Sequence, residues 1–217
     1  MFRRAGFECC QPMAVSPMKL TPFDLTIDSK LFSSDNRTRT KGCHLTDIIH
    51  DMEKAIGKDR NPRAMGEEKL ELYRTVGFLW EDVLTRVINS GRSWAISPGL
   101  IRPGEIELDG IWMTPDAVDF GVTPPVLEEW KVTWRSAGRD LESENWHWFV
   151  QMKAYCHALK LTRANLRILY VNGDYKPTVP RPQGYAIEFN QRELEEAWQM
   201  ICAHARSRGW LPKKEAV

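Results

Sequence analysis

The chain has 217 residues, with 42% hydrophobic and 27% charged residues and a formal net charge of +1. This composition is typical of a globular protein, most simply one domain with an appended arm, and it excludes a disordered chain. The low net charge does not indicate a nucleic-acid partner, although a local basic patch acts over a Debye length of roughly 10 Å. No apolar run approaches the roughly 20 residues that cross a bilayer, so we expect no membrane association.

The cysteines and the N-terminal residues bear on the cellular compartment. The five cysteines are an odd number without the spacing of a disulfide framework, and none forms a Cys-x-x-Cys pair. This pattern favours a reducing compartment and argues against a zinc or iron–sulfur site. The first residues include two arginines but lack the apolar stretch of a secretory signal. We therefore expect a cytoplasmic protein, in a bacterium or in a host cell.

The first third of the chain is expected to contain a tail, an arm and two helices. Residues 1–20 show no hydrophobic periodicity and are expected to form a flexible tail. An arm over 21–65 includes a short helix that begins with Thr46 as N-cap and ends before Gly57. A longer helix is expected over 66–89, where apolar residues recur at three- and four-residue spacing.

Strands and helices alternate through the rest of the chain. Strands are expected at 94–101, 105–113, 126–134, 164–172 and 184–189. A helix is expected over 143–160, and a last helix begins at a capping box formed by Asn190 and Glu193. This order predicts an α/β fold with a central mixed β-sheet flanked by helices.

The stretch "VLEEWKVTW", residues 126–134, carries charges on both faces of a strand that otherwise looks buried. With a period of two residues, Glu129 and Lys131 point to one face, with their Cβ atoms about 7 Å apart. Glu128 points to the other face, among β-branched and aromatic residues. A carboxylate beside an ammonium on one face fits a functional site, but it also fits the solvated face of an edge strand.

Asp109 is the candidate partner of Glu129. It lies 20 positions earlier in "GEIELDGIWM", which leaves room for the two strands to pair as a hairpin. Two neighbouring carboxylates need a cation, and Mg²⁺ takes one or two protein carboxylates and leaves positions for water and phosphate. The alternative is that Asp109 and Gly110 form only a hairpin turn, since Asp-Gly is a common turn signal.

These residues, together with a motif on the following helix, resemble the signature of the PD-(D/E)XK nuclease superfamily. Asp109 stands as the first acid, and "EWK" supplies Glu129 and Lys131. In "QMKAY", Gln151 and Tyr155 lie on one face of a helix, as in the Gln-x-x-x-Tyr motif of the RecB and lambda-exonuclease branch.

Two upstream segments extend this resemblance, and one position departs from it. "GFLWE" places Gly77 and Glu81 on the helix before the sheet, as in that branch. "KGCHLTDIIHDM" is similar to the segment ahead of the core in phage-type exonucleases. In the superfamily a proline often precedes the first acid, whereas Leu108 precedes Asp109 here.

The resemblance implies a restriction-endonuclease-like core over 66–217 that cleaves DNA with Mg²⁺, for which Mn²⁺ can substitute. It implies that Asp109 and Glu129 hold the ion, with the backbone carbonyl of Trp130 as a candidate further ligand, and that Glu81 reaches the same ion or a second one, directly or through water. Lys131 would orient the attacking water or neutralise developing charge. Gln151 and Tyr155 would position the metal site or the DNA, and their alternative is a polar edge on an amphipathic helix.

The function expected from this resemblance is an exonuclease that processes duplex DNA ends for phage or prophage recombination. A homo-oligomer and a single-strand annealing or binding protein are the further partners expected. A structure-specific or nicking endonuclease is the alternative within the nucleases. A DNA-binding protein that keeps the fold without catalysis is the alternative of another class.

Several other residues could contact DNA, each with a structural alternative. Arg135 and Arg139 follow the central strand and suit phosphate contacts, or they belong to a solvated loop. The basic stretch of Arg37, Arg39 and Lys41 either receives a terminal phosphate or is simply solvated. Stacking on unpaired bases and packing in the core are the two alternatives for Trp134, Trp146 and Trp148. His147 is the one histidine expected near the site, and its alternative is a packed or exposed histidine without a role there.

Overall fold

The computed structural model describes residues 40–57, 72–73, 75–77, 79, 99–176 and 180–212. Some expectations lie outside these residues, namely the tail over 1–20, the boundary at 66, Arg37, Arg39, Glu81 and most of the strand over 94–101. Of the helix expected over 66–89, the described residues between 72 and 79 are helical.

The arm over 40–57 begins with β1 (Cys43–His44) and α2 (Leu45–Ala55). The N-cap is the extended residue His44, so the expectation of Thr46 is wrong: the helix begins one residue before Thr46. Gly57 follows the helix with a φ of +70°, as expected for a residue just past a helix end. The arm packs on the rest of the molecule. β1 pairs with β4 (Ile111–Met113), and α2 contacts the helices α5 (Trp146–Leu159) and α6 (Gln191–Ser207).

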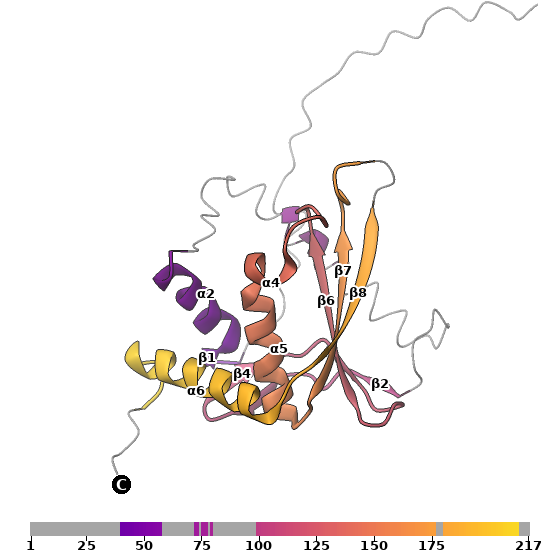
Figure 1. The fold of residues 1–217 in the computed structure, drawn as a ribbon. Helices are drawn as coiled ribbons and strands as arrows, with labels where there is room; N and C mark the ends of the chain where they lie inside the picture. Colours follow the sequence, from indigo (N-terminus) through magenta and orange to yellow (C-terminus); the bar gives the residue numbers. More distant parts are fainter. Residues whose placement is uncertain are drawn as a thin grey trace, which may run out of the picture.

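A five-stranded sheet forms the centre of the molecule (Figure 1). Its strand order is β2 (Leu100–Ile101), β5 (Ala117–Asp119), β6 (Val126–Thr133), β7 (Arg163–Tyr170) and β8 (Arg181–Glu188). The β6–β7 pair is parallel and the other pairs are antiparallel, which confirms the expected mixed sheet. β5 was not expected from the sequence, because three residues are too few to show a period of two.

A second, three-stranded sheet contains β1, β4 (Ile111–Met113) and β3 (Ile106–Leu108). The single strand expected over 105–113 is therefore two strands, joined at Asp109 and Gly110. Both turn residues have positive φ, +53° and +82°, as a two-residue hairpin turn requires. The expected pairing of this segment with 126–134 is wrong, since β3 pairs with β4 and β6 pairs with β5 and β7.

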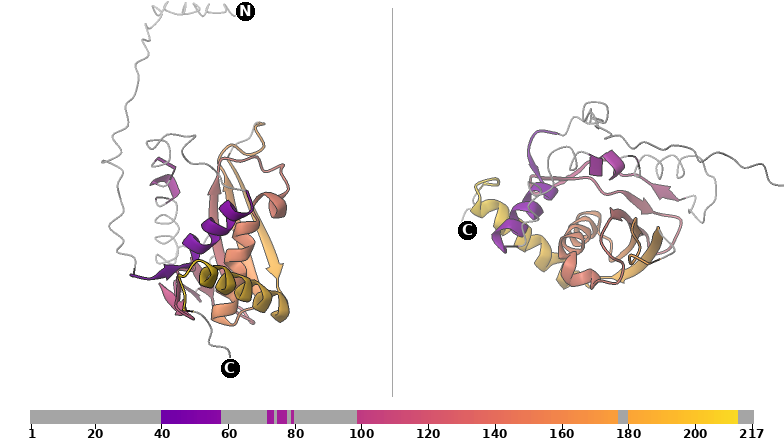
Figure 2. Two further views of the ribbon diagram at one scale, coloured as in Figure 1. Left: turned by 90° about the vertical axis from the view of Figure 1, so that its left-hand side faces the viewer. Right: turned by 90° about the horizontal axis from the view of Figure 1, so that it is seen from above.

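The helix expected over 143–160 is divided at Asn145 into α4 (Leu141–Glu144) and α5 (Trp146–Leu159). The capping box of Asn190 and Glu193 is confirmed at the start of α6 (Gln191–Ser207). Figure 2 shows α2 and α6 beside α5, which lies along the sheet.

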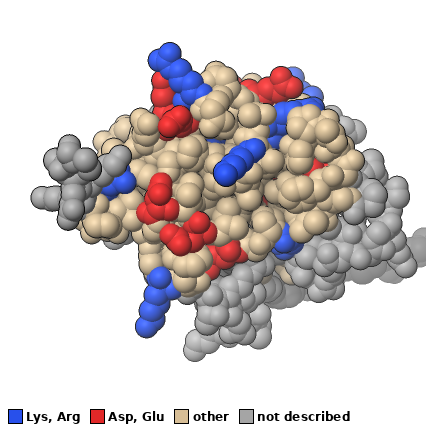
Figure 3. Space-filling view, turned by 90° about the horizontal axis from the view of Figure 1, so that it is seen from below, with Lys and Arg blue, Asp and Glu red and all other residues tan. Residues whose placement is uncertain are grey.

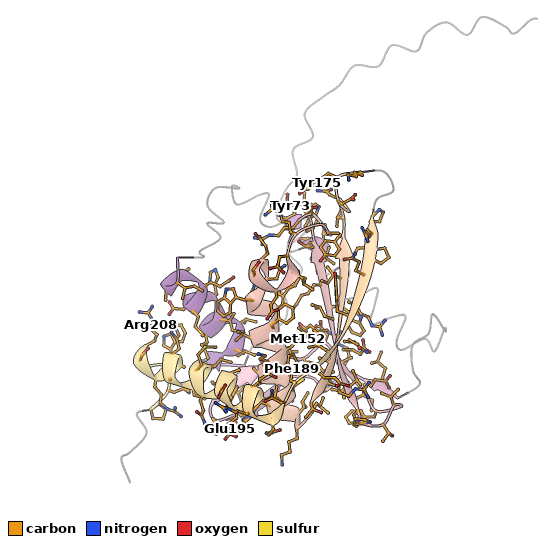
Figure 4. All side chains as sticks on the ribbon, in the orientation of Figure 1. Tyr73, Met152, Tyr175, Phe189, Glu195 and Arg208 are labelled. Carbon is orange, nitrogen blue, oxygen red and sulfur yellow. The ribbon has the colours of Figure 1, made fainter. Side chains whose placement is uncertain are left out.

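Alternating residues of β7 form the face of the sheet that belongs to the core. Ala164, Leu166, Ile168 and Tyr170 are buried, whereas Arg167 between them is exposed. Met152 of α5 lies between this helix and the sheet (Figure 4) and has no exposed surface. Among the described residues, no helix is both long and apolar enough to cross a membrane.

Candidate active site

Glu129 and Lys131 lie on the face of β6 that is turned toward α5. Glu129 is 1% exposed, and Lys131 Nζ donates to its Oε1 at 2.5 Å. The lysine side chain is 18% exposed. The solvated edge-strand alternative is thereby excluded, because β6 has neighbours on both sides and its Glu129 is buried.

Two residues of α5 continue this polar arrangement. Lys131 Nζ also donates to Gln151 Oε1 at 3.0 Å, and Gln151 Nε2 donates to the hydroxyl of Tyr155 at 2.7 Å. Tyr155 is buried at 2% exposure. The i and i+4 positions of Gln151 and Tyr155 on the helix make this contact possible. The structure thus brings together four of the expected site residues in one hydrogen-bonded chain from strand to helix.

Asp116 is a fifth member of this region, and sequence reasoning missed it. It immediately precedes β5, and its Oδ2 accepts a hydrogen bond from the backbone N–H of Trp130 at 2.8 Å. The Nε of Arg102 donates to the backbone carbonyl of Asp116 at 3.2 Å, which holds the same residue from the other side. Asp116 is preceded by Pro115, the residue that the superfamily often has before its first acid.

The strand register places Asp116 next to Glu129. β5 runs antiparallel to β6 with Ala117 opposite Glu128, so the register, continued by one residue beyond β5, would put Asp116 opposite Glu129. Directly opposite residues point to the same face, with Cβ atoms about 4.5–5.5 Å apart. The N–H and C=O of one strand residue point to the same edge. The carbonyl of Trp130 therefore faces the edge at which Asp116 lies.

Asp109, the first acid expected from the sequence, is not in this region. It lies in the β3–β4 turn, where its Oδ2 accepts a hydrogen bond from Trp198 Nε1 of α6 at 2.8 Å. The carboxylate therefore links the three-stranded sheet to α6. Asp109 is in the left-handed backbone region, which short polar residues tolerate in turns. The alternative interpretation of Asp-Gly as a turn signal is confirmed.

The oxygen donors around Glu129 fit Mg²⁺ by their chemistry. In the part of the chain that the structure describes, no group of three or more His, Cys, Asp or Glu side chains forms a metal site. The strand register and the hydrogen bond from the Trp130 amide lead us to expect the carboxylates of Asp116 and Glu129 beside the carbonyl of Trp130. Mg²⁺ prefers oxygen ligands and takes one or two protein carboxylates, with water and phosphate in its other positions. Glu81, the further ligand expected, lies outside the described residues.

Glu128 points to the opposite face of β6 and is held firmly there. It is 4% exposed; Arg167 donates to it from Nε at 2.6 Å and from Nη2 at 3.2 Å. Asn165 donates to the same carboxylate at 2.7 Å. The Glu128 carboxylate in turn raises the pKa of Arg167 through this hydrogen bond. These contacts join β6 to β7, which is a structural role.

The two arginines after β6 share one acidic partner. Arg135 Nη1 donates to the Glu144 carboxylate and Arg139 Nη1 donates to the same oxygen, both at 3.3 Å. Arg135 also donates to the backbone carbonyl of Glu144 at 3.2 Å. These exposed pairs are worth little in stability, so the arginines remain candidates for phosphate contacts.

The tryptophans divide between the core and the end of β6. Trp148 is buried in the core, which favours packing over base stacking. Trp146 is partly buried against the same core. Trp134, just after β6, lies with its ring centroid 4.4 Å from that of Tyr73. Lys41, the described part of the expected basic stretch, is exposed.

Cys156 of α5 lies close enough to Glu129 for the charge of this carboxylate to affect the pKa of the thiol. Burial, and to a smaller extent the Glu129 carboxylate, raise the pKa of the Cys156 thiol to about 12. A thiol with this pKa stays protonated at neutral pH, so Cys156 is excluded as a nucleophile.

The described residues on the lower face of the molecule form no basic patch. Figure 3 shows acidic side chains gathered near the middle of this face, with lysines and arginines placed singly around them. A DNA backbone needs clustered positive charge, so this face is a poor surface for it.

Comparison with known proteins finds solved structures that resemble this chain at low sequence identity. No family model matches the sequence, and no curated protein matches it. A protein named SSO0001 is 14% identical with a TM-score of 0.46, over 80% of each chain. An alkaline exonuclease from Laribacter hongkongensis is 13% identical with a TM-score of 0.46, over 76% of this chain and 87% of that one.

A phage-related exonuclease from Haemophilus somnus 129PT is 14% identical with a TM-score of 0.40. The match covers 75% of this chain and 79% of that one.

Proposed function

We propose that the protein is an Mg²⁺-dependent deoxyribonuclease whose site lies between β6 and α5. One observation carries this proposal: the Asp116 carboxylate accepts a hydrogen bond from the Trp130 amide. Trp130 lies between Glu129 and Lys131, which form a hydrogen-bonded chain with Gln151. Two carboxylates and a lysine on one sheet face, at the start of β5 and within β6, reproduce the acid, acid and lysine arrangement of the PD-(D/E)XK resemblance. Asp116 takes the role that the sequence alone suggested for Asp109.

In this proposal Asp116, Glu129 and the backbone carbonyl of Trp130 would hold the ion. Mg²⁺ held there would supply Lewis-acid stabilisation of the charge that develops on the phosphate and would assist ionisation of the attacking water. The Asp116 carboxylate is held in place by a hydrogen bond from the Trp130 amide. The backbone carbonyl of Asp116 is held by a hydrogen bond from Arg102 Nε. Mn²⁺, which also prefers oxygen ligands, can occupy the same donor set.

Lys131 neutralises the negative charge of the transition state. Its ammonium is held by Glu129 and by Gln151, so its position is set before DNA binds. A charged donor that is fixed in advance needs no reorganisation during the reaction. Gln151 is itself oriented by Tyr155, and both are therefore positioning residues.

The substrate proposed is double-stranded DNA, degraded from its ends in the cytoplasm. The support is the order of motifs shared with the lambda-exonuclease branch, from Glu129 and Lys131 to Gln151 and Tyr155. The same proposal includes a role in the recombination of phage or prophage DNA. It also includes a single-strand annealing or binding protein as a partner, and self-association of the chain.

Linear and closed circular duplexes, each incubated with and without Mg²⁺, test the proposal. Degradation of the linear form alone, dependent on Mg²⁺, supports an exonuclease. Cutting of the circle indicates an endonuclease, and binding without cleavage indicates a DNA-binding protein that keeps the fold. The Asp116→Asn variant should lose the cleavage observed with the parent protein.

A further inference from the structure

Three aromatic side chains meet where β6 ends, just beyond Lys131. The ring centroids of Tyr73 and Trp134 lie 4.4 Å apart, with 42° between the ring planes. The hydroxyl of Tyr175 donates to the backbone carbonyl of Trp134 at 3.2 Å. Figure 4 shows Tyr73 and Tyr175 at this end of the molecule. We call Tyr73, Trp134 and Tyr175 the aromatic platform.

The aromatic platform reaches solvent, unlike the large rings of the core. Tyr175 is 65% exposed, more than any other large hydrophobic residue among those that the structure describes. Tyr73 and Trp134 are half-buried, whereas Trp148 and Tyr155 are buried. Packing accounts for the buried rings, because burial removes their apolar surface from water. It does not account for Tyr175.

Tyr175 is also held in an unfavourable backbone conformation. Its φ of +65° lies in the left-handed region, which residues with bulky side chains rarely adopt. Two hydrogen bonds hold the neighbouring loops together: the Ala137 amide donates to the Gly173 carbonyl at 2.8 Å, and Asn172 Nδ2 donates to the Trp134 carbonyl at 3.2 Å. Backbone strain of this kind is concentrated at functional sites. The strained loop fixes an exposed ring at the end of β6.

Two arginines follow the aromatic platform in the sequence. Arg135 and Arg139 share the carboxylate of Glu144, so two positive charges stand against one negative charge. The Arg139 side chain is 57% exposed, and an exposed ion pair of this kind is weak. Aromatic rings beside basic side chains are the groups that bind single-stranded nucleic acids, since bases stack on the rings and phosphates meet the positive charge.

β6 connects the aromatic platform to the proposed site. Trp134 follows Lys131 after three steps along the chain, which is about 10 Å in an extended strand. A DNA strand advances by about 3.4 Å per nucleotide, so a strand with a phosphate at Lys131 reaches Trp134 about three nucleotides away. Bases within a duplex are covered by their neighbours in the stack. Only unpaired bases can therefore offer their faces to an aromatic ring at this distance.

We propose that the aromatic platform, together with Arg139, binds an unpaired segment of the DNA about three nucleotides from the scissile phosphate. Unpaired bases stack on Tyr175 and Trp134, and Arg139 contacts the backbone. This inference rests on the nuclease proposed above. It names the form of the substrate beside the site as a single strand, such as a frayed duplex end exposes.

The first test compares a short labelled single strand with a relaxed closed circular duplex, which has neither ends nor unpaired bases. Affinities are measured without divalent cations. Tyr175→Ala should weaken binding of the single strand roughly tenfold and leave binding of the circle within about twofold, because it removes one stacking ring. Parental binding of the single strand, or an equal loss on both DNAs, overturns the inference. The matched control is Trp210→Ala, which removes another exposed ring just after α6 and should leave both affinities unchanged.

Two further substitutions of Tyr175 separate binding from folding. Tyr175→Asn removes the ring and relieves the strain, because Asn tolerates the left-handed region. Its thermal midpoint should equal or exceed that of the parent, while its affinity for the single strand falls as far as in Tyr175→Ala. Tyr175→Phe keeps the ring and should bind the single strand within about threefold of the parent. A loss in Tyr175→Phe as large as in Tyr175→Ala overturns stacking on this ring.

The salt dependence of single-strand binding tests Arg139. Each phosphate contact adds about 0.7 to the slope of the logarithm of the affinity against the logarithm of the salt concentration. Arg139→Gln should reduce this slope by about that amount. Arg192→Gln removes the same charge from another exposed pair, with Glu196 on α6, and should leave the slope unchanged. An unchanged slope in Arg139→Gln overturns the backbone contact.

Cleavage with Mg²⁺, measured on the same proteins, separates this inference from the nuclease proposal. A parent protein that cleaves DNA, with a Tyr175→Ala variant of parental affinity for the single strand, contradicts the inference alone. A parent protein that binds the single strand through Tyr175 and cleaves no DNA contradicts the nuclease proposal alone. A parent protein that neither binds the single strand nor cleaves DNA contradicts both.

Discussion

Glu128 and Glu129 are neighbours in β6 and are both buried, yet their surroundings give them different roles. The Glu128 carboxylate faces the planar guanidinium of Arg167 and an Asn165 amide, which occupy both of its oxygens. Glu129 faces the compact ammonium of Lys131, with Asp116 opposite it across the β5–β6 pair. A fixed guanidinium fork suits a structural pair, whereas an ammonium beside two carboxylates suits a metal and phosphate site. This difference in neighbours is the reason why we propose Glu129, and not Glu128, for the chemistry.

The largest expected effect separates these two acids directly. Glu129→Gln should lower DNA cleavage by roughly 10³-fold or more, because it removes a charged ligand of the metal. Glu128→Gln should keep cleavage within a few-fold of the parent rate, since its partners are on the other face. Single-turnover cleavage rates measure both. Equal losses in the two variants would contradict the division of roles.

Lys131 gives the next effect. Lys131→Ala should lower the cleavage rate by about 10²–10³-fold, as when one preorganised charged donor is removed. Mg²⁺ affinity should stay the same or rise, because a positive charge beside Glu129 is gone. Lys131→Arg should not restore the rate, because a planar fork cannot replace a point charge held by Gln151. Near-parental rates in both variants would end the assignment of "EWK" to the site.

Gln151 should have a smaller effect, through the orientation of Lys131. Gln151→Leu keeps the size of the side chain and removes its contacts with Lys131 and Tyr155. Supporting residues of this kind typically change activity by about 10–100-fold. The decrease should be in kcat, with DNA affinity little changed. A rise in KM at constant kcat would instead assign Gln151 to DNA binding.

The smallest effect is expected on the opposite face and concerns stability. Arg167→Gln removes the charged partner of Glu128 and leaves a buried carboxylate with only Asn165 and the new amide. The free energy of unfolding should fall by about 1–2 kcal/mol, discounted because Arg167 is half exposed. Urea unfolding measures this change, and cleavage at 25 °C serves as the control. A large loss of cleavage without a loss of stability would contradict a structural role.

Much of this site could be predicted from local sequence, because period and capping are local properties. The alternation in residues 126–134 placed Glu129 and Lys131 on one face, and the helical spacing placed Gln151 and Tyr155 together. The capping box at Asn190 likewise fixed the start of α6. In each case the pattern repeats within a few residues, so no tertiary information was needed.

The first acid of the site could not be derived in the same way, because strand pairing is a tertiary property. One strand was expected over 105–113, and the turn at Asp109–Gly110 divides it into two. β5, which carries the chain from Asp116 into the sheet, has only three residues and gives no periodic signal. Pro115 before Asp116 was the available signal, since a proline often stands before the first acid in the superfamily.

The choice between Asp116 and Asp109 is the most direct test of the proposed site. Asp116→Asn and Asp109→Asn each remove one negative charge and preserve shape, and Mg²⁺ dependence of duplex cleavage is measured for both. We expect Asp116→Asn to abolish cleavage at all Mg²⁺ concentrations. Asp109→Asn, whose amide oxygen can still accept from Trp198, should follow the parental titration. Parental cleavage by Asp116→Asn together with loss in Asp109→Asn would contradict the account.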